Sequence, residues 1–271
     1  MTDDPAGFTG SIPEQYDRGL GPCLFADYAE LLAQRVAALR PLRVLETAAG
    51  TGIVTRRLRD LLPPAAQLIA TDLHPPMLAL AEGKFGAAEA VAFQPADAMA
   101  LPFPDGAFDV LACQFGVMFF PDRPAAFREA RRVLTQGGRY LFSVWDGLGQ
   151  NAYGRIADAV AGALFPADPP AFFAVPHGYH RIDPIREALQ AAGFGGLRID
   201  ILPREVAIPD LAGFARAVVF GTPFLGLIRA RGGEPERVMD AVLAGFRAEF
   251  GPEPARMRLQ AILFEADCAG A

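Results

Sequence analysis

Residues 44–52 place an acidic side chain and two glycines directly after a short apolar stretch. Glu46 closes the apolar residues, and Gly50 and Gly52 lead into a helical pattern that starts at Ile53. Glycine permits a tight turn and lets backbone N–H groups approach a ligand closely, at the carboxyl end of a strand in an α/β sheet. The pattern therefore predicts a ligand-binding turn between a strand and a helix.

A second acidic residue follows the next apolar stretch. Asp72 lies twenty residues after Gly52 and directly follows the apolar residues 68–71. An acidic side chain in that place can accept hydrogen bonds from both hydroxyls of a ribose. The two strand ends together predict a site for a cofactor that contains a nucleoside.

Strands and helices alternate around these residues. Apolar positions at helical spacing predict a helix from Leu24 to Leu39, which Pro41 ends. The strands predicted after it are 42–47, 67–71, 91–94, 108–113 and 139–145, and the helices are 53–62, 75–85 and 124–134. Repeated strand–helix units with apolar strands indicate a parallel sheet covered on both faces.

The pattern changes after Asp146. Residues 151–180 indicate a helix and an aromatic loop, 182–194 a helix, 197–201 a strand, 209–250 two or more helices, and 258–264 a last strand. A helical block between two late strands favours an insertion that covers a site. The expected divisions are an N-terminal helical segment (1–40), a cofactor-binding core (41–146), and the remainder of the sheet (147–271) with insertions at 147–181 and 209–252.

Composition excludes several classes of partner. Of 271 residues, 52% are hydrophobic and the net charge is −6, which leaves too few cations to neutralise the phosphates of a nucleic acid. Prolines and charged residues interrupt the apolar stretch 206–228, so no membrane span is expected. Three scattered cysteines, Cys23, Cys113 and Cys268, form no CxxC motif and favour a reduced, cytoplasmic setting.

Five motifs in sequence order resemble those of class I S-adenosylmethionine-dependent methyltransferases. They lie at 44–52, 71–73, 97–103, 108–109 and 134–138. More narrowly, the sequence resembles the methyltransferases that include the ubiquinone/menaquinone C-methylating enzymes. This resemblance is strong over residues 40–146. It implies a doubly wound, seven-stranded, mostly parallel α/β sheet whose last strand is antiparallel, a helical cap insertion, and S-adenosyl-L-methionine as cofactor with S-adenosyl-L-homocysteine as product.

The resemblance also assigns roles around the glycine-rich turn. Ala48, Gly50 and Gly52 would approach the methionine moiety, and Asp72 would hold the ribose hydroxyls. Two departures from the family pattern matter, and a third, Gln136 in place of the usual proline, has little functional weight. Glu46 replaces the commoner aspartate, which keeps the charge but makes the acidic side chain longer. Ala48 stands where the family usually has glycine, so close approach depends on alanine tolerating that backbone conformation.

The later strand ends would complete the cofactor site. The resemblance places Leu73 and Met77 against the adenine, Asp97 and Ala98 at the adenine edge, and Gln114 beside the cofactor where the substrate enters.

Most of these assignments have a structural alternative. Asp72 and Asp97 are also common as caps of helices and turns. Glu46 could instead favour the N-terminus of the following helix, where negative charge is stabilising. Gln114 could be a polar residue at a strand end, and Met77 a core residue.

Four residues outside the core are also considered. Tyr16 is predicted to fold over the cofactor, where an aromatic face would attract a sulfonium, and Tyr28 to pack within its helix. His177 and His180, in the aromatic insertion, are the candidate general bases for an acceptor that must lose a proton. The alternative is that both are loop histidines without a catalytic role.

The acceptor is judged from the predicted insertions. Aromatic side chains concentrate there at Phe165, Phe172, Phe173, Phe214, Phe220 and Phe224. They favour a small, lipophilic acceptor, because small-molecule sites are largely apolar, or else they form the core of the helical cap. No acidic pair or His/Cys cluster indicates a metal. Monomer and homodimer both remain open.

Two rival functions are weighed against methyl transfer. A non-catalytic S-adenosylmethionine-binding or scaffold protein would keep the cofactor contacts without an acceptor cavity. A nicotinamide-dependent reductase is less favoured, because Ile53 occupies the place of the third glycine in G-x-G-x-x-G. A Tyr-x-x-x-Lys motif is also impossible, since Lys84 is the only lysine.

Overall fold

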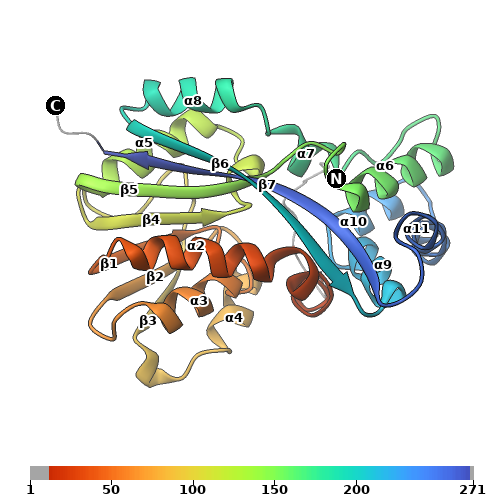
Figure 1. The fold of residues 1–271 in the computed structure, drawn as a ribbon, viewed down its shortest axis with the longest axis horizontal. Helices are drawn as coiled ribbons and strands as arrows, with labels where there is room; N and C mark the ends of the chain where they lie inside the picture. Colours follow the sequence, from red (N-terminus) through yellow and green to blue (C-terminus); the bar gives the residue numbers. More distant parts are fainter. Residues whose placement is uncertain (1–11, 269–271) are drawn as a thin grey trace. The chain divides into compact units, whose positions relative to one another are not determined.

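A computed structural model describes residues 12–268 of the chain (Figure 1). Its strands are β1 (Arg43–Thr47), β2 (Gln67–Asp72), β3 (Val91–Pro95), β4 (Phe108–Gln114), β5 (Leu134–Trp145), β6 (Gly195–Ile208) and β7 (Ala255–Asp267). Its longer helices are α2 (Ala26–Ala38), α3 (Ile53–Leu61), α4 (Pro75–Glu82), α5 (Arg123–Val133), α6 (Ala152–Leu164), α8 (Ile182–Ala191), α9 (Leu211–Phe220) and α11 (Pro235–Phe250). Shorter turns of helix are α1 (Ile12–Gln15), η2 (Ala87–Glu89), η3 (Val117–Phe119), α7 (Ala174–Gly178) and α10 (Phe224–Ala230), and η1 (Tyr16–Phe25) is a π-helix.

The strands form one seven-stranded sheet in the order β3-β2-β1-β4-β5-β7-β6. The pairs β1–β2, β1–β4, β2–β3 and β4–β5 are parallel. The last strand runs the other way: Gly137 at the start of β5 bonds to Cys268, whereas Asp146 beyond the end of β5 bonds to Gln260. The predicted doubly wound sheet with an antiparallel last strand is confirmed.

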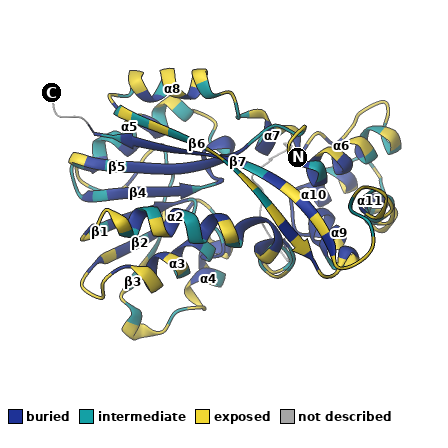
Figure 2. Ribbon diagram, viewed as in Figure 1, coloured by how far each residue is buried: buried dark blue, intermediate teal, exposed yellow. Residues whose placement is uncertain are grey.

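Helices cover both faces of the parallel strands. Glu46, Ala112 and Leu141 are register neighbours on β1, β4 and β5, so they share a face, and Phe142 points to the opposite one. Thr55 of α3 contacts Glu46 on the first face, whereas Phe127 of α5 packs against Phe142 on the second. The central strands are accordingly buried on both sides (Figure 2).

The described chain divides into two compact units. We call residues 27–144, 180–201 and 262–268 the sheet unit, and residues 12–26, 145–179 and 202–261 the helical unit. The expected N-terminal segment 1–40 begins with residues 1–11, which lie outside the described residues. Within residues 12–268 no single helix is long and apolar enough to cross a membrane; α9 and α10 reach that measure only as a pair bent by 65°.

Aromatic side chains make the core of the helical unit. Phe214 of α9 stacks on Phe246 of α11 with ring centroids 5.3 Å apart, and Phe173 meets Phe224 at 5.3 Å. The insertion phenylalanines at 172, 173, 214, 220 and 224 are all buried. Their burial favours the alternative in which these rings form a helical core.

Candidate cofactor-binding site

The predicted polar residues lie at or just beyond the ends of four neighbouring strands. Glu46 lies in β1, Asp72 and Gln114 are the last residues of β2 and β4, and Asp97 follows β3. Since these strands are parallel and adjacent in the sheet, their carboxyl ends lie at one edge (Figure 1). The structure therefore brings these four residues to the same edge of the sheet unit.

The turn between β1 and α3 has left-handed backbone at three positions. Ala48, Gly50 and Gly52 have φ values of 53°, 57° and 80°. A Cβ added to Gly52 would lie 2.9 Å from the Cβ of Ala81 in α4, whereas one added to Gly50 would meet only Met77 Cε, at 3.6 Å. Gly52 is thus also required for packing against α4, while Gly50 leaves its backbone approachable.

Ala48 is accommodated by a glycine that the sequence analysis missed. A Cβ built on Gly116, just beyond β4, would overlap the methyl group of Ala48 and lie 2.8 Å from Cys113 Sγ. The space that the family's usual glycine would leave at position 48 is therefore provided at position 116. The signal was present in the residues Cys113–Gly116, but only the tertiary contact gives it meaning.

We expect the residues at positions 48 and 116 to be energetically coupled. Gly116→Ala should lower the free energy of unfolding by about 2 kcal/mol, because the added methyl overpacks the contact. Ala48→Gly removes the overlapping methyl and relieves a left-handed alanine, so the double variant should regain most of that loss. Urea denaturation of the four proteins measures the coupling, and strictly additive losses would argue against it.

Asp72 fixes the turn as well as closing β2. Its side chain is 8% exposed; Oδ2 accepts from the N–H of Gly50 at 2.8 Å, and Oδ1 accepts from the N–H of His74 at 2.9 Å. An ionised carboxylate offers about four lone-pair directions, so further hydroxyl donors can still be accepted. The turn-capping alternative is thus present in the structure, and it is compatible with the ribose role, which stays a prediction.

The predicted adenine contacts differ in their exposure. Leu73 is 60% exposed, and Met77 is buried beside Gly50. Asp97 Oδ1 accepts from the N–H of Met99 at 2.8 Å, which makes a side-chain-capped turn, and Ala98 within that turn is half-buried. The exposed Leu73 gives the β2 end an apolar surface, as an aromatic base would require.

Glu46 is almost completely buried at 1% exposure. Its Oε2 lies 2.6 Å from Thr55 Oγ1 in the first turn of α3, so it contacts that helix start as the structural alternative proposed. Burial raises the pKa of Glu46 to about 8; the Thr55 hydroxyl opposes this shift and the negative charge of Asp72 adds to it. Its contact with a cofactor stays a prediction.

Ser143 is a buried polar group that the sequence analysis did not single out. It pairs in register with Gln114 at the ends of β5 and β4, so the two side chains share a face of the sheet. Ser143 is 2% exposed, and among residues 12–268 its hydroxyl has no hydrogen-bond partner. Nothing in its sequence context marks it, because it lies within an apolar strand.

Ser143→Ala is expected to raise the free energy of unfolding by about 1 kcal/mol, since a buried hydroxyl without a partner is costly. Thr222→Val is the matched control, because the Thr222 hydroxyl donates to the carbonyl of Val218 at 2.8 Å. That control should lose about 1 kcal/mol. Thermal denaturation compares the two, and equal losses in both variants would show that the Ser143 hydroxyl is satisfied.

The two candidate histidines belong to different units. His177 is 2% exposed in the helical unit, with Nδ1 2.9 Å from the carbonyl oxygen of Asp146 and Nε2 3.2 Å from the hydroxyl of Tyr153. Both ring nitrogens thus have intramolecular partners, which favours a structural histidine over a base. His180 is half-buried in the sheet unit. A catalytic role for either stays a prediction.

The two N-terminal tyrosines are also divided between the units. Tyr28 in the sheet unit is buried and meets Phe115 edge-on at 5.6 Å, as ordinary helix packing requires. Tyr16 in the helical unit stacks on Phe25 at 4.8 Å. Contact of Tyr16 with a cofactor stays a prediction.

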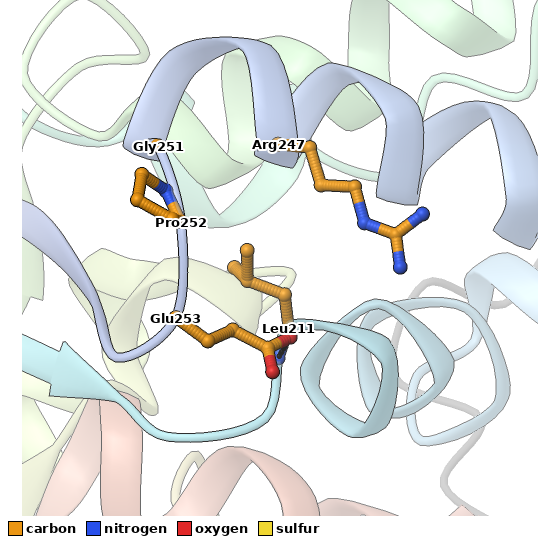
Figure 3. Close-up of a pocket in the computed structure, with 5 residues that line it drawn as sticks. All are labelled: Leu211, Arg247, Gly251, Pro252 and Glu253. Carbon is orange, nitrogen blue, oxygen red and sulfur yellow. Dashed lines mark hydrogen bonds between the residues drawn. The ribbon is translucent and has the colours of Figure 1, made fainter.

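A separate pocket lies in the helical unit (Figure 3). It is lined by Leu211, Arg247, Gly251, Pro252 and Glu253. Glu253 accepts from the N–H of Leu211 at 3.0 Å, so its carboxylate caps the start of α9. None of the predicted site residues lines this pocket.

Comparison with known proteins supports the interpretation of the sequence motifs as those of a methyltransferase. A family described as a methyltransferase domain matches residues 45–142. Demethylmenaquinone methyltransferase of Thermus thermophilus is 42% identical over 120 residues, 43% of this chain and 53% of its own length. Malonyl-[acyl-carrier protein] O-methyltransferase of Geobacter sulfurreducens is 29% identical over 79% of this chain and 78% of its own. The chain thus matches only about half the length of the Thermus relative.

A solved structure supports the fold. Phosphoethanolamine N-methyltransferase 2 of Haemonchus contortus superposes with a TM-score of 0.62 at 15% identity, over 98% of this chain and 59% of that one. The matched segment runs from β1 to β5 and contains the glycine-rich turn, Asp72, Asp97 and Gln114. The chain therefore carries, over residues 45–142, a segment that matches a methyltransferase domain and is similar to the demethylmenaquinone methyltransferase of Thermus thermophilus.

Proposed function

We propose that the chain is an S-adenosylmethionine-dependent methyltransferase that acts on a small, lipophilic metabolite by in-line methyl transfer. One observation carries the proposal. Four polar residues lie at the carboxyl ends of four adjacent strands, beside the β1–α3 turn with its left-handed backbone: Glu46, Asp72, Asp97 and Gln114. All four belong to the segment that matches a methyltransferase domain. Open α/β sheets bind their ligands at this edge.

The residues fit an adenosyl cofactor laid along the strand order β3, β2, β1, β4. Asp97 and Ala98 would meet the adenine edge, and Asp72 the ribose hydroxyls. The open backbone at Gly50 would receive the methionine moiety, as only glycine leaves that approach free. Gln114 would then lie beside the transferable methyl group. In that arrangement the acceptor would lie toward β4 and β5.

When bound, S-adenosylmethionine supplies a methyl group already activated on a sulfonium. The work left to the protein is to align the acceptor with the methyl–sulfur axis and to exclude water. Gln114 and Ser143 are the polar side chains at the β4 and β5 ends, and they can orient an acceptor that carries oxygen. Neither supplies a charge that would have to be neutralised.

The acceptor class is supported by the relatives rather than by the insertion phenylalanines, because most of those rings are buried in the core of the helical unit. The Thermus relative is named for demethylmenaquinone, and the Geobacter relative for a malonyl group on an acyl carrier protein. These names share an acceptor that bears oxygen, and they differ in size and polarity. The proposal is accordingly a small, lipophilic acceptor with an oxygen function near the methylated atom.

We also propose a cytoplasmic location, a monomeric or homodimeric state, and no nucleic-acid partner. Cys23, Cys113 and Cys268 are all free and buried, as suits a reducing compartment. The net charge of −6 disfavours binding to phosphate polymers.

Calorimetry and a methyl-transfer assay test the function. Titration with S-adenosylmethionine, S-adenosylhomocysteine and NADH should show binding of the first two; binding of NADH alone would refute the proposal. Incubation with labelled S-adenosylmethionine and a lipophilic metabolite extract should then label a small product. Cofactor binding without transfer to broad extracts would favour the non-catalytic binding protein.

A further inference from the structure

Glu46 is a buried acid that faces no cationic group among residues 12–268. From α3 it meets the neutral hydroxyl of Thr55, from β2 the carboxyl of Asp72, and from β4 the thiol of Cys113. Burial raises the pKa of the Cys113 thiol to about 12, so that group is neutral at pH 7. Isolating an ionised carboxylate from water in such surroundings is costly, and the group takes up a proton instead.

The groups that stabilise the negative charge of Asp72 do not also stabilise a charge on Glu46. Both oxygens of Asp72 accept backbone N–H groups, and His74 Nδ1 lies 3.6 Å from Asp72 Oδ1. Any positive charge on His74 therefore lies against Asp72. The glycine-rich turn that begins after Thr47 is the place where a ligand would bring positive charge toward Glu46.

Resting on the proposed function, we infer that Glu46 is protonated in the free protein and loses that proton when S-adenosylmethionine binds. The O–H bond of the carboxyl group breaks, the proton passes to solvent, and the carboxylate remains opposite the ligand's cationic groups. S-adenosylmethionine carries a sulfonium, an ammonium and a carboxylate, for a net charge of +1. S-adenosylhomocysteine lacks the sulfonium and is neutral overall.

The coupling has a direction that follows from mass action. Because binding of the donor releases a proton, its affinity rises with pH until Glu46 is ionised without ligand, near pH 8, and above that Glu46 adds no further pH dependence. One proton gives at most a tenfold change in Kd per pH unit. The neutral product gains less from the carboxylate, so acidification shifts the preference of the site from donor toward product.

Isothermal titration calorimetry at pH 7, in buffers of different ionisation enthalpy, counts the released protons. The variants are the wild type, Glu46→Gln, and Glu187→Gln as a control carboxyl exposed on α8. We expect release of up to one more proton on S-adenosylmethionine binding in the wild type and Glu187→Gln than in Glu46→Gln. An α-amino group has a pKa of about 8, so the ligand's ammonium is already mostly protonated at pH 7 and takes up little on binding; the difference therefore belongs to Glu46.

Infrared difference spectroscopy of the wild type gives a readout that needs no variant. The C=O stretching band of a protonated carboxyl should disappear when S-adenosylmethionine is added, and should disappear less completely with S-adenosylhomocysteine. Binding with equal proton release in the wild type and Glu46→Gln, or with no loss of that band, would overturn the inference. Failure of S-adenosylmethionine to bind at all would instead refute the proposed function, and the inference with it.

Discussion

Asp72→Ala is expected to weaken S-adenosylmethionine binding by about 3 kcal/mol, roughly a hundredfold in Kd. Two charge-assisted hydrogen bonds to ribose hydroxyls would be lost. The same substitution removes the acceptor for the Gly50 N–H, so the turn that receives the methionine moiety loses its anchor to β2. Calorimetric titration of wild type and variant measures the change, and an unchanged Kd would refute the ribose role.

A matched control separates ligand contact from loss of a capping carboxylate. Asp210 caps α9 and accepts from the N–H of Gly213 at 2.8 Å, yet it belongs to the helical unit. Asp210→Ala should cost about 1 kcal/mol in stability and leave the Kd unchanged. Asp72→Asn keeps one acceptor oxygen, so its affinity should fall between those of the wild type and Asp72→Ala.

The strands of the sheet unit could be predicted because their signals are local. The stretches 42–47, 67–71 and 108–113 are apolar without alternation and are bounded by turn residues, as buried parallel strands are. Each matches an observed strand to within one residue at either end.

β6 is longer than predicted for a reason that local rules miss. The sequence predicts a strand at 197–201, but the strand runs from Gly195 to Ile208. Pro203 argues against a continuous strand in the interior of a sheet, since it lacks the N–H that a ladder needs. β6 lies at the sheet edge, where that donor is not required. Edge position is a property of the topology and cannot be read from residues 195–208 alone.

The π-helix η1 was likewise unforeseen. Its residues include Gly19, Gly21 and Pro22, which normally break helices. A Cβ on Gly19 would overlap the side chain of Ala217 in α9, so this glycine permits two helices of the helical unit to approach closely. Packing between distant segments overrides the local propensity here.

At the site, residue types were predictable and their partners were not. The sequence identifies Glu46 and Asp72, but Thr55 reaches Glu46 only when α3 is folded back on β1, and the Gly50 N–H reaches Asp72 only when β1 and β2 pair. His177 shows the same limit. It lies in a stretch that resembles an exposed loop, but Gly154 leaves the space in which its ring is buried: a Cβ there would lie 2.9 Å from Nε2.

Glu46 should make the free protein less stable as pH rises from about 4.5 to about 8. Its pKa is about 4.3 in an unfolded chain, whereas burial raises the pKa of the folded group to about 8. Between these values the folded state binds the extra proton, so the free energy of unfolding falls with pH, by at most about 1.4 kcal/mol per unit. Below about pH 4 the carboxyl is neutral in both states and the penalty is absent.

Glu46→Gln isolates this effect, because the amide keeps the size of the side chain and cannot ionise. Urea denaturation of both proteins at pH 5, 6.5 and 8 measures this effect. The free energy of unfolding of the variant should rise relative to that of the wild type at each step, by a few kcal/mol over the whole range. Other acids do not obscure the comparison: Arg132 lowers the pKa of Glu129, and the two proteins share that opposite dependence. Parallel stability curves would mean that Glu46 is ionised in the free protein, because a carboxylate already charged at pH 5 has no proton left to lose.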